Sequence, residues 1–566
     1  MQAGIPVGEL PEIDPFVRTP TAFIAPFFFK RDAVGYGINL LNANSVAGTH
    51  DRCQIVGIKN ILKYNAKVAL PVAQHFLYSG YPFRRHDFFN LQMYRNVASA
   101  KHQRSNAIPY KFFIFRRYTI HMKDKGINVK PVDRIMKPFL RFIHKSSTSG
   151  IVLFASAFVA IILSNSPWSE SFHHIWEIEF SIGFNGRMLS KSLHHWINDG
   201  LMAVFFFVVG LELKREIMAG ELSTPSKAAL PIAAAAGGMI FPALIYIFFN
   251  PEGDAASGWG IPMATDIAFA LGILYLLGDR VPMTLKIFLT ALAIADDIGA
   301  VLVIAFFYTS EIHFDSLLQA GVYLAVLTIA NRIGIRNSIF YAVIGIGGVW
   351  LAFLLSGVHA TIAAVLIAFT IPASVKVNEE YYSTELETLL QRFKDEEPNN
   401  VSLVTNEQLH IVEAIQNLSK KALTPLQQLE HTLHPFVSFV IMPLFALSNA
   451  GVSIDSTFFS NLTSPIAIGV FSGLLLGKFI GVMAVAMIFL KLGWARMPEG
   501  MTLLHLAGGA VLAGIGFTMS LFISELAFAD ELLIRQARIG ILCASLLSSL
   551  AGYFIIRHAC RGGKVI

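Results

Sequence analysis

Two adjacent aspartates, Asp296 and Asp297, lie in the middle of the apolar run IFLTALAIADDIGAVLVIAFF. No other charged residue occurs between Ile287 and Phe307, and the run is long enough to cross a bilayer as a helix. A carboxylate at bilayer depth costs about 3 kcal/mol or more, so such residues usually mark functional sites. We therefore predict a buried functional site around this pair. A pair that merely anchors neighbouring helices is the structural alternative.

The composition is that of an integral membrane protein. Of the 566 residues, 54% are hydrophobic and only 14% are charged, with a mean hydropathy of +0.56. Soluble domains contain about 25% charged residues. The net charge of +6 fits basic cytoplasmic loops better than nucleic-acid binding. Three cysteines (Cys53, Cys543 and Cys560) have neither the number nor the spacing of a disulfide framework or a metal site.

From Gly150 to Ile556, apolar runs of membrane-spanning length follow one another with one polar interruption. The sequence therefore predicts an all-α membrane protein with about 12 transmembrane helices. They are expected at residues 149–165, 196–212, 227–249, 258–278, 284–308, 316–330, 338–355, 357–373, 435–451, 465–490, 501–523 and 533–556.

The charges of the connecting loops support this count. The loops after the second, fourth, sixth, eighth and tenth predicted spans are basic. Those after the third, fifth, ninth and eleventh contain acids but no Lys or Arg. The positive-inside rule then places the even-numbered loops and both termini in the cytoplasm. The first external loop, with Arg187 and Lys191, is an exception.

Two regions lie outside this pattern. Residues 1–135 show neither helical nor strand periodicity, and they are interpreted as a region of unknown fold, either disordered or a soluble accessory domain, or as a misassigned start. We favour the last, with translation beginning at Met122 or Met136. The polar insert at 376–430 reads as two short amphipathic helices around a Pro-Asn-Asn turn, forming a cytoplasmic lid or spacer.

Charged residues occur near the centre of three predicted spans. Asp266 lies in the fourth, the aspartate pair in the fifth and Lys478 in the tenth. Such groups avoid lipid, so we expect them to converge on one cavity. Adjacent helix positions point about 100° apart, because a turn contains 3.6 residues. One aspartate can therefore face the cavity while the other meets Lys478. A clustered acid of this kind can hold either a proton or a small cation, which is the basis for exchange.

Two predicted spans look interrupted. In the fourth, Pro262 and Thr265 precede Asp266, and proline removes a helix hydrogen bond. The eleventh contains four glycines near its middle, at Gly508, Gly509, Gly514 and Gly516. Broken helices in corresponding positions of two halves point to a transporter binding site, so spans three to five and ten to twelve are predicted to be two inverted repeats. Glycine-rich helix packing is the alternative for the eleventh.

Polar groups also gather at the predicted cytoplasmic edges of two spans. The second span ends in GLELKREIMAG, which contains Glu212, and the ninth begins after LEHTLHP, which contains Glu430, His431 and His434. Histidine has an unperturbed pKa near 6.5 and is a natural pH sensor. Interfacial anchoring explains each of these residues equally well when it is taken singly.

Several stretches resemble the NhaA-type sodium/proton antiporters: VFFFVVGLELKREI, PMATDIAFALGIL, LTALAIADDIGAVLVIA, SGVHATIAAV, HPFVSFVIMPLFALSNAGV, GLLLGKFIGV and GIGFTMSLFI. The resemblance runs in order over residues 145–558, and the ATDIAFALG and AIADDIGA motifs are specific. The chain departs from the family in its N-terminal region, in its longer insert and at Gln427 and Gln428. These departures bear on the pH response rather than on the ion site.

The resemblance implies a role for each matching position. Asp297 would be the main carboxylate for Na⁺ and H⁺, and Asp296 its neighbour, which binds or pairs with Lys478. Asp266 and Thr265 would compensate the partial charges of the crossed broken helices. The remaining positions would form the pH response, namely Glu212, Glu430, His431, His434 and Asp199.

The predicted function is therefore secondary transport, not enzymatic catalysis: export of Na⁺, with Li⁺ as a further substrate, in exchange for H⁺. The resemblance implies electrogenic exchange that is activated by alkaline cytoplasmic pH and serves pH and sodium homeostasis. An intramembrane aspartyl protease would need acids on two helices and a Gly-x-Gly-Asp pattern, which the sequence lacks. A sodium-coupled symporter for an organic solute is the closer alternative.

The remaining expectations concern surroundings and partners. We predict a multi-pass protein of the bacterial inner membrane, in contact with lipid. No cofactor and no nucleic acid is expected, and the transported ions are Na⁺, Li⁺ and H⁺. A homodimer remains open.

Overall fold

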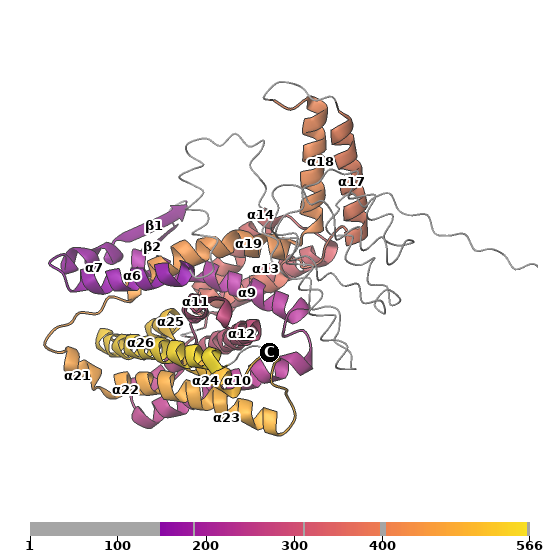
Figure 1. The fold of residues 1–566 in the computed structure, drawn as a ribbon. Helices are drawn as coiled ribbons and strands as arrows, with labels where there is room; N and C mark the ends of the chain where they lie inside the picture. Colours follow the sequence, from indigo (N-terminus) through magenta and orange to yellow (C-terminus); the bar gives the residue numbers. More distant parts are fainter. Residues whose placement is uncertain (1–147, 185–186, 310–311, 397–402, 563–566) are drawn as a thin grey trace, which may run out of the picture. The chain divides into compact units, whose positions relative to one another are not determined.

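The computed structural model describes residues 148–184, 187–309, 312–396 and 403–562. These residues are mostly helical (Figure 1), which confirms the prediction of an all-α membrane protein in its general form. The predictions for residues 1–135, including the alternative starts, lie outside the described residues.

Each of the predicted spans corresponds to a helix or to a set of consecutive helices. In order, they are α6 (Thr148–Ser164); α8 (Leu193–His195), η3 (Trp196–Leu201) and α9 (Met202–Ala219); α10 (Pro225–Phe249); η4 (Asp254–Met263) and α11 (Ile267–Leu276); α12 (Met283–Phe307); α13 (Phe314–Ile333); α14 (Ser338–Ile344), η6 (Gly345–Trp350) and α15 (Leu351–Ser356); α16 (Ala360–Thr370); α19 (Pro425–Phe436), η7 (Val437–Ile441) and α20 (Met442–Asn449); α22 (Pro465–Ser472), η8 (Gly473–Gly477) and α23 (Lys478–Lys491); α24 (Leu503–Leu512) and α25 (Phe517–Ala527); and α26 (Glu531–Gly562). Three short helices connect them, namely α7 (Ser169–Glu177), η5 (Gly278–Arg280) and α21 (Phe458–Leu462).

Length and composition support most of these spans. Within the described residues, 9 helices are long and apolar enough to cross a membrane. Two further pairs qualify together but are bent, α6 with α7 by 116° and α24 with α25 by 42°. The helix α16 is shorter, with 11 residues. The chain is thus a multi-pass membrane protein, while the count of 12 spans and the inverted repeats stay predictions.

Two helix ends extend further than the hydrophobicity pattern predicted. The second span continues to Ala219, so the charged turn after Glu212 is helical. The ninth begins at Pro425 rather than near residue 435, because Thr424 caps the helix by accepting a hydrogen bond from the backbone N–H of Gln427. Both predicted polar edges therefore belong to rigid helices rather than to loops.

A small β-hairpin occupies the loop between the first two predicted spans and was not predicted. Strand β1 (Glu179–Phe184) pairs antiparallel with β2 (Arg187–Ser192), with Glu179 opposite Ser192. This hairpin contains the two basic residues that break the charge alternation. Its short strands produce too little period-2 signal to stand out beside long apolar runs.

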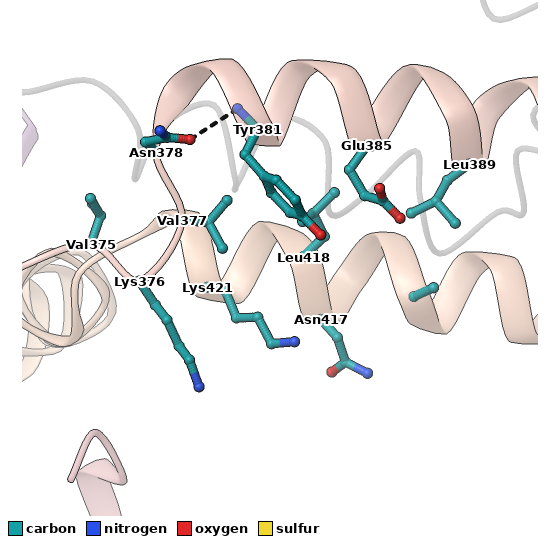
Figure 2. A pocket seen from close by; sticks show the side chains of 11 residues that line it. Val375, Lys376, Val377, Asn378, Tyr381, Glu385, Leu389, Asn417, Leu418 and Lys421 are labelled. Carbon is teal, nitrogen blue, oxygen red and sulfur yellow. Dashed lines mark hydrogen bonds between the residues drawn. The ribbon is translucent and has the colours of Figure 1, made fainter. Parts of the chain in front are cut away.

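The polar insert contains the helices α17 (Glu379–Asp395) and α18 (Asn406–Ala422), which lie side by side (Figure 1). The Pro-Asn-Asn turn between them lies outside the described residues. The side chain of Asn378 caps α17 by accepting from the N–H of Tyr381, and Thr405 caps α18. A groove of about 860 Å³ lies between α17 and α18, near the start of α17 and the end of α18. Figure 2 shows its lining residues, which include Lys376 and Lys421.

Helices α10 and α23 approach each other closely through glycines. A Cβ atom on Gly237 would lie 2.3 Å from the carbonyl oxygen of Gly481, and one on Gly481 would lie 2.1 Å from that of Gly237. Small residues allow membrane helices to make such backbone contacts. The contact fixes α23 against α10 and thereby places Lys478, the first residue of α23, inside the protein.

Candidate functional site

The fourth span is broken at the predicted position. The 3₁₀-helix η4 ends at Met263, residues 264–266 are extended, and α11 begins at Ile267. Asp266 caps α11, since its Oδ1 accepts a hydrogen bond from the N–H of Phe269 at 2.9 Å. Pro262 lies in the last turn of η4 and cannot donate a backbone hydrogen bond. The break therefore exposes backbone polar groups inside the protein.

The eleventh span is broken between α24 and α25, at residues 513–516. Of the four glycines that predicted this interruption, Gly514 and Gly516 lie in the break. Gly508 and Gly509 lie inside α24, before the break. Their role is close packing: a Cβ atom on Gly508 would lie 2.4 Å from the Ile556 side chain.

The two breaks meet and satisfy each other's polar groups. The backbone N–H of Asp266 donates to the carbonyl of Ile515 at 2.7 Å. The Thr265 hydroxyl lies 2.8 Å from the carbonyl oxygen of Ala513. In return, the N–H and the hydroxyl of Thr518 donate to Asp266 Oδ2 at 3.1 and 2.6 Å. Irregular backbone at membrane depth is stable only with partners of this kind.

Asp296 is held from two sides. Its Oδ2 forms an ion pair with the Lys478 ammonium group, and both side chains are fully buried. The Thr265 hydroxyl lies 2.7 Å from the same oxygen. A hydroxyl has one hydrogen, so Thr265 donates to Asp296 or to the Ala513 carbonyl at any moment. Thr265 thus couples the aspartate to the crossing of the broken helices.

Asp297 has a different environment from its neighbour. It is 1% exposed, and neither of its carboxylate oxygens has a hydrogen-bond partner among the described residues. The Oδ1 of Asp296 also has none. Three buried acceptor oxygens on adjacent residues are costly to leave unpaired, so they need a proton, water or a cation. The arrangement can therefore bind a small cation or protons in competition.

Lys478 directly follows a π-helical segment. The helix η8 ends at Gly477, immediately before the lysine. Such segments widen a helix locally and often occur at functional sites. The structure therefore gathers Asp266, Asp296, Asp297, Thr265 and Lys478 into one cluster, as their positions in the sequence predicted. Their roles in transport stay predictions.

The predicted pH-response residues separate into two places. Arg215 Nε donates to both carboxylate oxygens of Glu430, at 3.0 and 3.2 Å, and its Nη1 lies 2.7 Å from Glu216 Oε1. Glu212 interacts electrostatically with Glu430, and His434 with Glu430 and His431. Glu212 also acts on Asp297. These four predicted residues therefore form one cluster, which we call the inner cluster and which acts electrostatically on Asp297 through Glu212.

Asp199 does not belong to this inner cluster. It lies in η3, 13 residues before Glu212, which corresponds to roughly 20 Å along a helix. Its electrostatic neighbours are instead His359, His195, Lys191 and His194. It was grouped with the others because a resemblance gives no distances.

One residue of the crossing, Thr518, was not predicted from the sequence. Thr518, in the GIGFTMS motif, provides both a hydroxyl and an N–H to Asp266 and is fully buried. A hydroxyl two residues after a glycine in a broken span was the available signal, but such threonines are common in membrane helices.

Outside the membrane-spanning helices, one ion pair has a marked effect on a carboxyl group. Arg535 Nη2 lies 2.6 Å from Asp455 Oδ2, and the Thr457 hydroxyl donates to Asp455 Oδ1 at 2.7 Å. These hydrogen bonds, that of Arg535 first, lower the pKa of Asp455 from 3.8 to about 2.

Buried ionisable groups at two crossed helix breaks, in a chain of membrane-crossing helices, define a secondary transporter of the broken-helix class. The profile of the family described as Na⁺/H⁺ antiporter 1 matches residues 140–556. The chain therefore belongs to this family, and it is a transporter rather than an enzyme.

Three bacterial relatives show how far the similarity extends. The Na⁺/H⁺ antiporter NhaA of Oleidesulfovibrio alaskensis is 48% identical over 443 residues, which cover 78% of this chain and 98% of the relative. That of Acidithiobacillus ferrooxidans is 49% identical over 421 residues, or 74% and 96% of the two chains. The Na⁺/H⁺ antiporter NhaA 1 of Saccharophagus degradans is 44% identical over 463 residues, or 81% and 98%.

Proposed function

We propose that this protein exports Na⁺, and also Li⁺, from the cytoplasm in exchange for protons. The observation that carries the proposal is the pair of unpartnered, buried carboxylate oxygens of Asp297, beside an Asp296 that Lys478 holds. Family membership supports the choice of ions, because the relatives are named Na⁺/H⁺ antiporters.

Competition for Asp297 explains the exchange. When this carboxyl group is deprotonated, its two oxygens and Asp296 Oδ1 are hard anionic ligands suited to Na⁺ or Li⁺. A proton neutralises the same oxygens, and the cation then loses its ligands. Because both ions use one set of oxygens, the site changes its exposure between the two sides of the membrane with either protons or a cation bound. A proton gradient therefore drives Na⁺ outward.

Asp296 and Lys478 provide the second part of the site. A cation that draws Asp296 Oδ1 toward itself competes with the Lys478 ammonium group for the same carboxylate. The ion pair between Lys478 and Asp296 is then weakened. We further propose that more protons than sodium ions move per cycle, because the carboxyl groups of both Asp296 and Asp297 lie at the site, so the exchange is electrogenic.

The crossed breaks support alternating exposure of this site. Thr265, Asp266 and Thr518 hold the half-helices together without lipid-exposed polar groups. The half-helices can therefore move as one unit against the other helices, as rocking of two bundles requires. We further propose that the 12 spans contain two inverted repeats centred on these breaks.

Regulation and location complete the proposal. Glu212, Glu430, His431 and His434 sense cytoplasmic pH, with Glu212 acting electrostatically on Asp297. Activation then occurs at alkaline pH. The protein resides in the bacterial inner membrane with both termini in the cytoplasm. A homodimer is consistent with this function but is not needed for it, since one chain contains all these groups.

The test is Na⁺-dependent dequenching of a pH-gradient dye in proteoliposomes that contain the full-length protein and no organic solute. We expect exchange with the unmodified chain and its loss in Asp297→Asn, because the amide cannot take up a proton or provide a charged ligand. Asp455→Asn, an exposed substitution, is the matched control and keeps its activity. Undiminished exchange in Asp297→Asn would contradict the site, and a requirement for an organic solute would favour the symporter.

A further inference from the structure

A polar cluster connects four of the predicted spans, at the end of the second span opposite to Glu212. His194 Nε2 lies 3.0 Å from Asn449 Oδ1 and 3.7 Å from Glu525 Oε2. Arg538 Nη2 donates to Glu525 Oε1 at 2.7 Å, and Asn449 donates to Asn198 Oδ1 at 3.1 Å. The Glu525 side chain is 10% exposed. We call these five residues the outer cluster.

The outer cluster joins two groups of helices. Glu525 in α25 and Arg538 in α26 belong with the helices that carry or cover the crossed breaks. His194, Asn198 and Asn449 belong to α8, η3 and α20, which contribute no residue to the crossing. The approach of His194 Nε2 to Glu525 Oε2, at 3.7 Å, therefore links the group with the ion site to the group without it.

At the inner end, the hydrogen bonds and ion pairs that Arg215 and Lys214 of α9 make with described residues do not form such a link. Arg215 contacts Glu216 in its own helix and Glu430 in α19. Lys214 donates to the carbonyls of Phe369 and Ile371, at the end of α16. All of these partners lie in helices that take no part in the crossing. Among the polar contacts named here for α8, η3 and α9, only the contact of His194 with Glu525 reaches the helix group that carries the ion site. This contact lies at the outer end.

Three buried aromatic rings lie beneath the outer cluster and join the same two groups. The ring of Phe522 in α25 lies 5.4 Å from that of Phe206 in α9 and 6.3 Å from that of Phe445 in α20, measured between centroids. All three residues are at most 1% exposed. We call them the aromatic triad.

The helix α25 contributes one residue to the ion site, one to the aromatic triad and one to the outer cluster. We call the triad and the outer cluster the two layers. Thr518, Phe522 and Glu525 follow one another in α25 at spacings of four and three residues, so they lie on one face over two turns. Thr518 holds Asp266, Phe522 is the central ring of the triad, and Glu525 contacts His194. The distance from Thr518 to Glu525 along the helix is about 10 Å. A movement of α25 that opens the site outward must therefore separate both layers.

We propose that the outer cluster and the aromatic triad form the outer gate of the transport path, and that Glu525 and His194 are positioning residues which hold this gate closed. The inference rests on the alternating exposure proposed above. The triad excludes water from the ion site, and the contact between Glu525 and His194 keeps the two helix groups together outside the triad. Weakening this contact shifts the population toward the outside-open state without changing any ion ligand.

A buried reporter cysteine tests the proposal. Ser524 is fully buried next to Glu525, and its hydroxyl bonds only within its own helix, to Leu521. In a full-length chain whose three natural cysteines are replaced by serine, Ser524→Cys reacts slowly with a membrane-impermeant thiol reagent added outside. Addition of Glu525→Ala is expected to raise this rate about fivefold or more, the size of a typical coupling between states.

Three further variants make the result specific. Glu525→Gln keeps an acceptor for Arg538 and should restore slow labelling in part. His194→Gln should act in the same direction as Glu525→Ala, and it replaces that variant if the latter does not fold. Asp455→Asn breaks an exposed ion pair at the same end and should leave the rate unchanged.

A second readout separates a gate from a merely structural role. A larger outside-open population lowers the apparent affinity for Na⁺ offered from the cytoplasmic side, in proportion to the lost inside-open fraction, while maximal exchange persists. Equal labelling rates with and without Glu525→Ala would overturn the gate, as would an equal increase in Asp455→Asn. The proposed function fails separately, if the unmodified chain shows no Na⁺/H⁺ exchange.

Discussion

Two ion pairs of the same chemistry have opposite surroundings in this protein. Lys478 and Asp296 are both 0% exposed, whereas Arg535 in α26 and Asp455 in the loop after α20 are 29% and 44% exposed. Water screens the exposed pair and solvates either partner when the other is lost. The buried pair has no such alternative, so loss of one partner leaves an uncompensated charge. Burial, rather than contact distance, decides how much each pair matters.

The buried region also contains a carboxyl group, that of Asp297, without a hydrogen-bond partner among the described residues. This group is expected to lower stability while it serves the proposed function. Asp297 costs free energy in the folded state, because its two oxygens are buried without hydrogen bonds from the described residues. Functional sites often retain such costs. The exposed pair is expected to contribute little to stability, because water screens it. Three substitutions test this comparison.

Replacement of the buried cation should have the largest effect. Lys478→Ala leaves Asp296 with only the Thr265 hydroxyl as a partner, so we expect a loss of about 3–5 kcal/mol of stability. Thermal unfolding of the purified full-length protein in detergent measures it. Since Ala also leaves a void, Lys478→Met is the matched control for packing. A midpoint unchanged in both variants would contradict the importance of this pair.

Loss of a neutral hydrogen bond in the same region should have a smaller effect. Thr518→Val keeps the shape of the side chain but removes the hydroxyl that donates to Asp266, while the backbone N–H contact remains. We expect a loss of about 1–3 kcal/mol. Thr518→Ser should restore most of it. Equal midpoints for the valine variant and the unmodified protein would show that the crossing of the broken helices does not depend on this side chain.

The exposed pair should have the smallest effect, and one that depends on pH. The pKa of Asp455 is lowered in the folded state, from 3.8 to about 2, so its contacts stabilise the fold above pH 3.8 and are lost as the pH falls through about 2. Asp455→Asn should therefore lower the thermal midpoint slightly at neutral pH, and the difference from the unmodified protein should vanish near pH 2. A difference that grows in acid would reverse the assigned sign.

Much of the site could be predicted from the sequence because charges in apolar runs are rare. Asp266, Asp296, Asp297 and Lys478 each stand out against membrane-spanning segments, and the cost of burying them in lipid is enough to predict that they converge. The break before Asp266 was also predictable from Pro262. The break in the eleventh span was harder to locate, because glycine serves packing as well as interruption, and Gly508 and Gly509 proved to be packing residues.

The features missed by sequence analysis depend on contacts between distant segments. The hydroxyl of Thr518 is important because it donates a hydrogen bond to Asp266, which lies 252 residues away in the sequence. The contact between His194 and Glu525 likewise joins distant parts of the chain. Periodicity and composition contain no information on such distances.

By itself, the sequence determined that this is a helical membrane protein with a costly acid pair at the centre of a span, since hydrophobicity and charge are local properties of the chain. Only the tertiary structure decided that Lys478 and Thr265 hold Asp296 while Asp297 stays without a partner among the described residues. Neighbouring residues on a helix point in different directions, and the helices packed against each direction determine what each carboxylate meets.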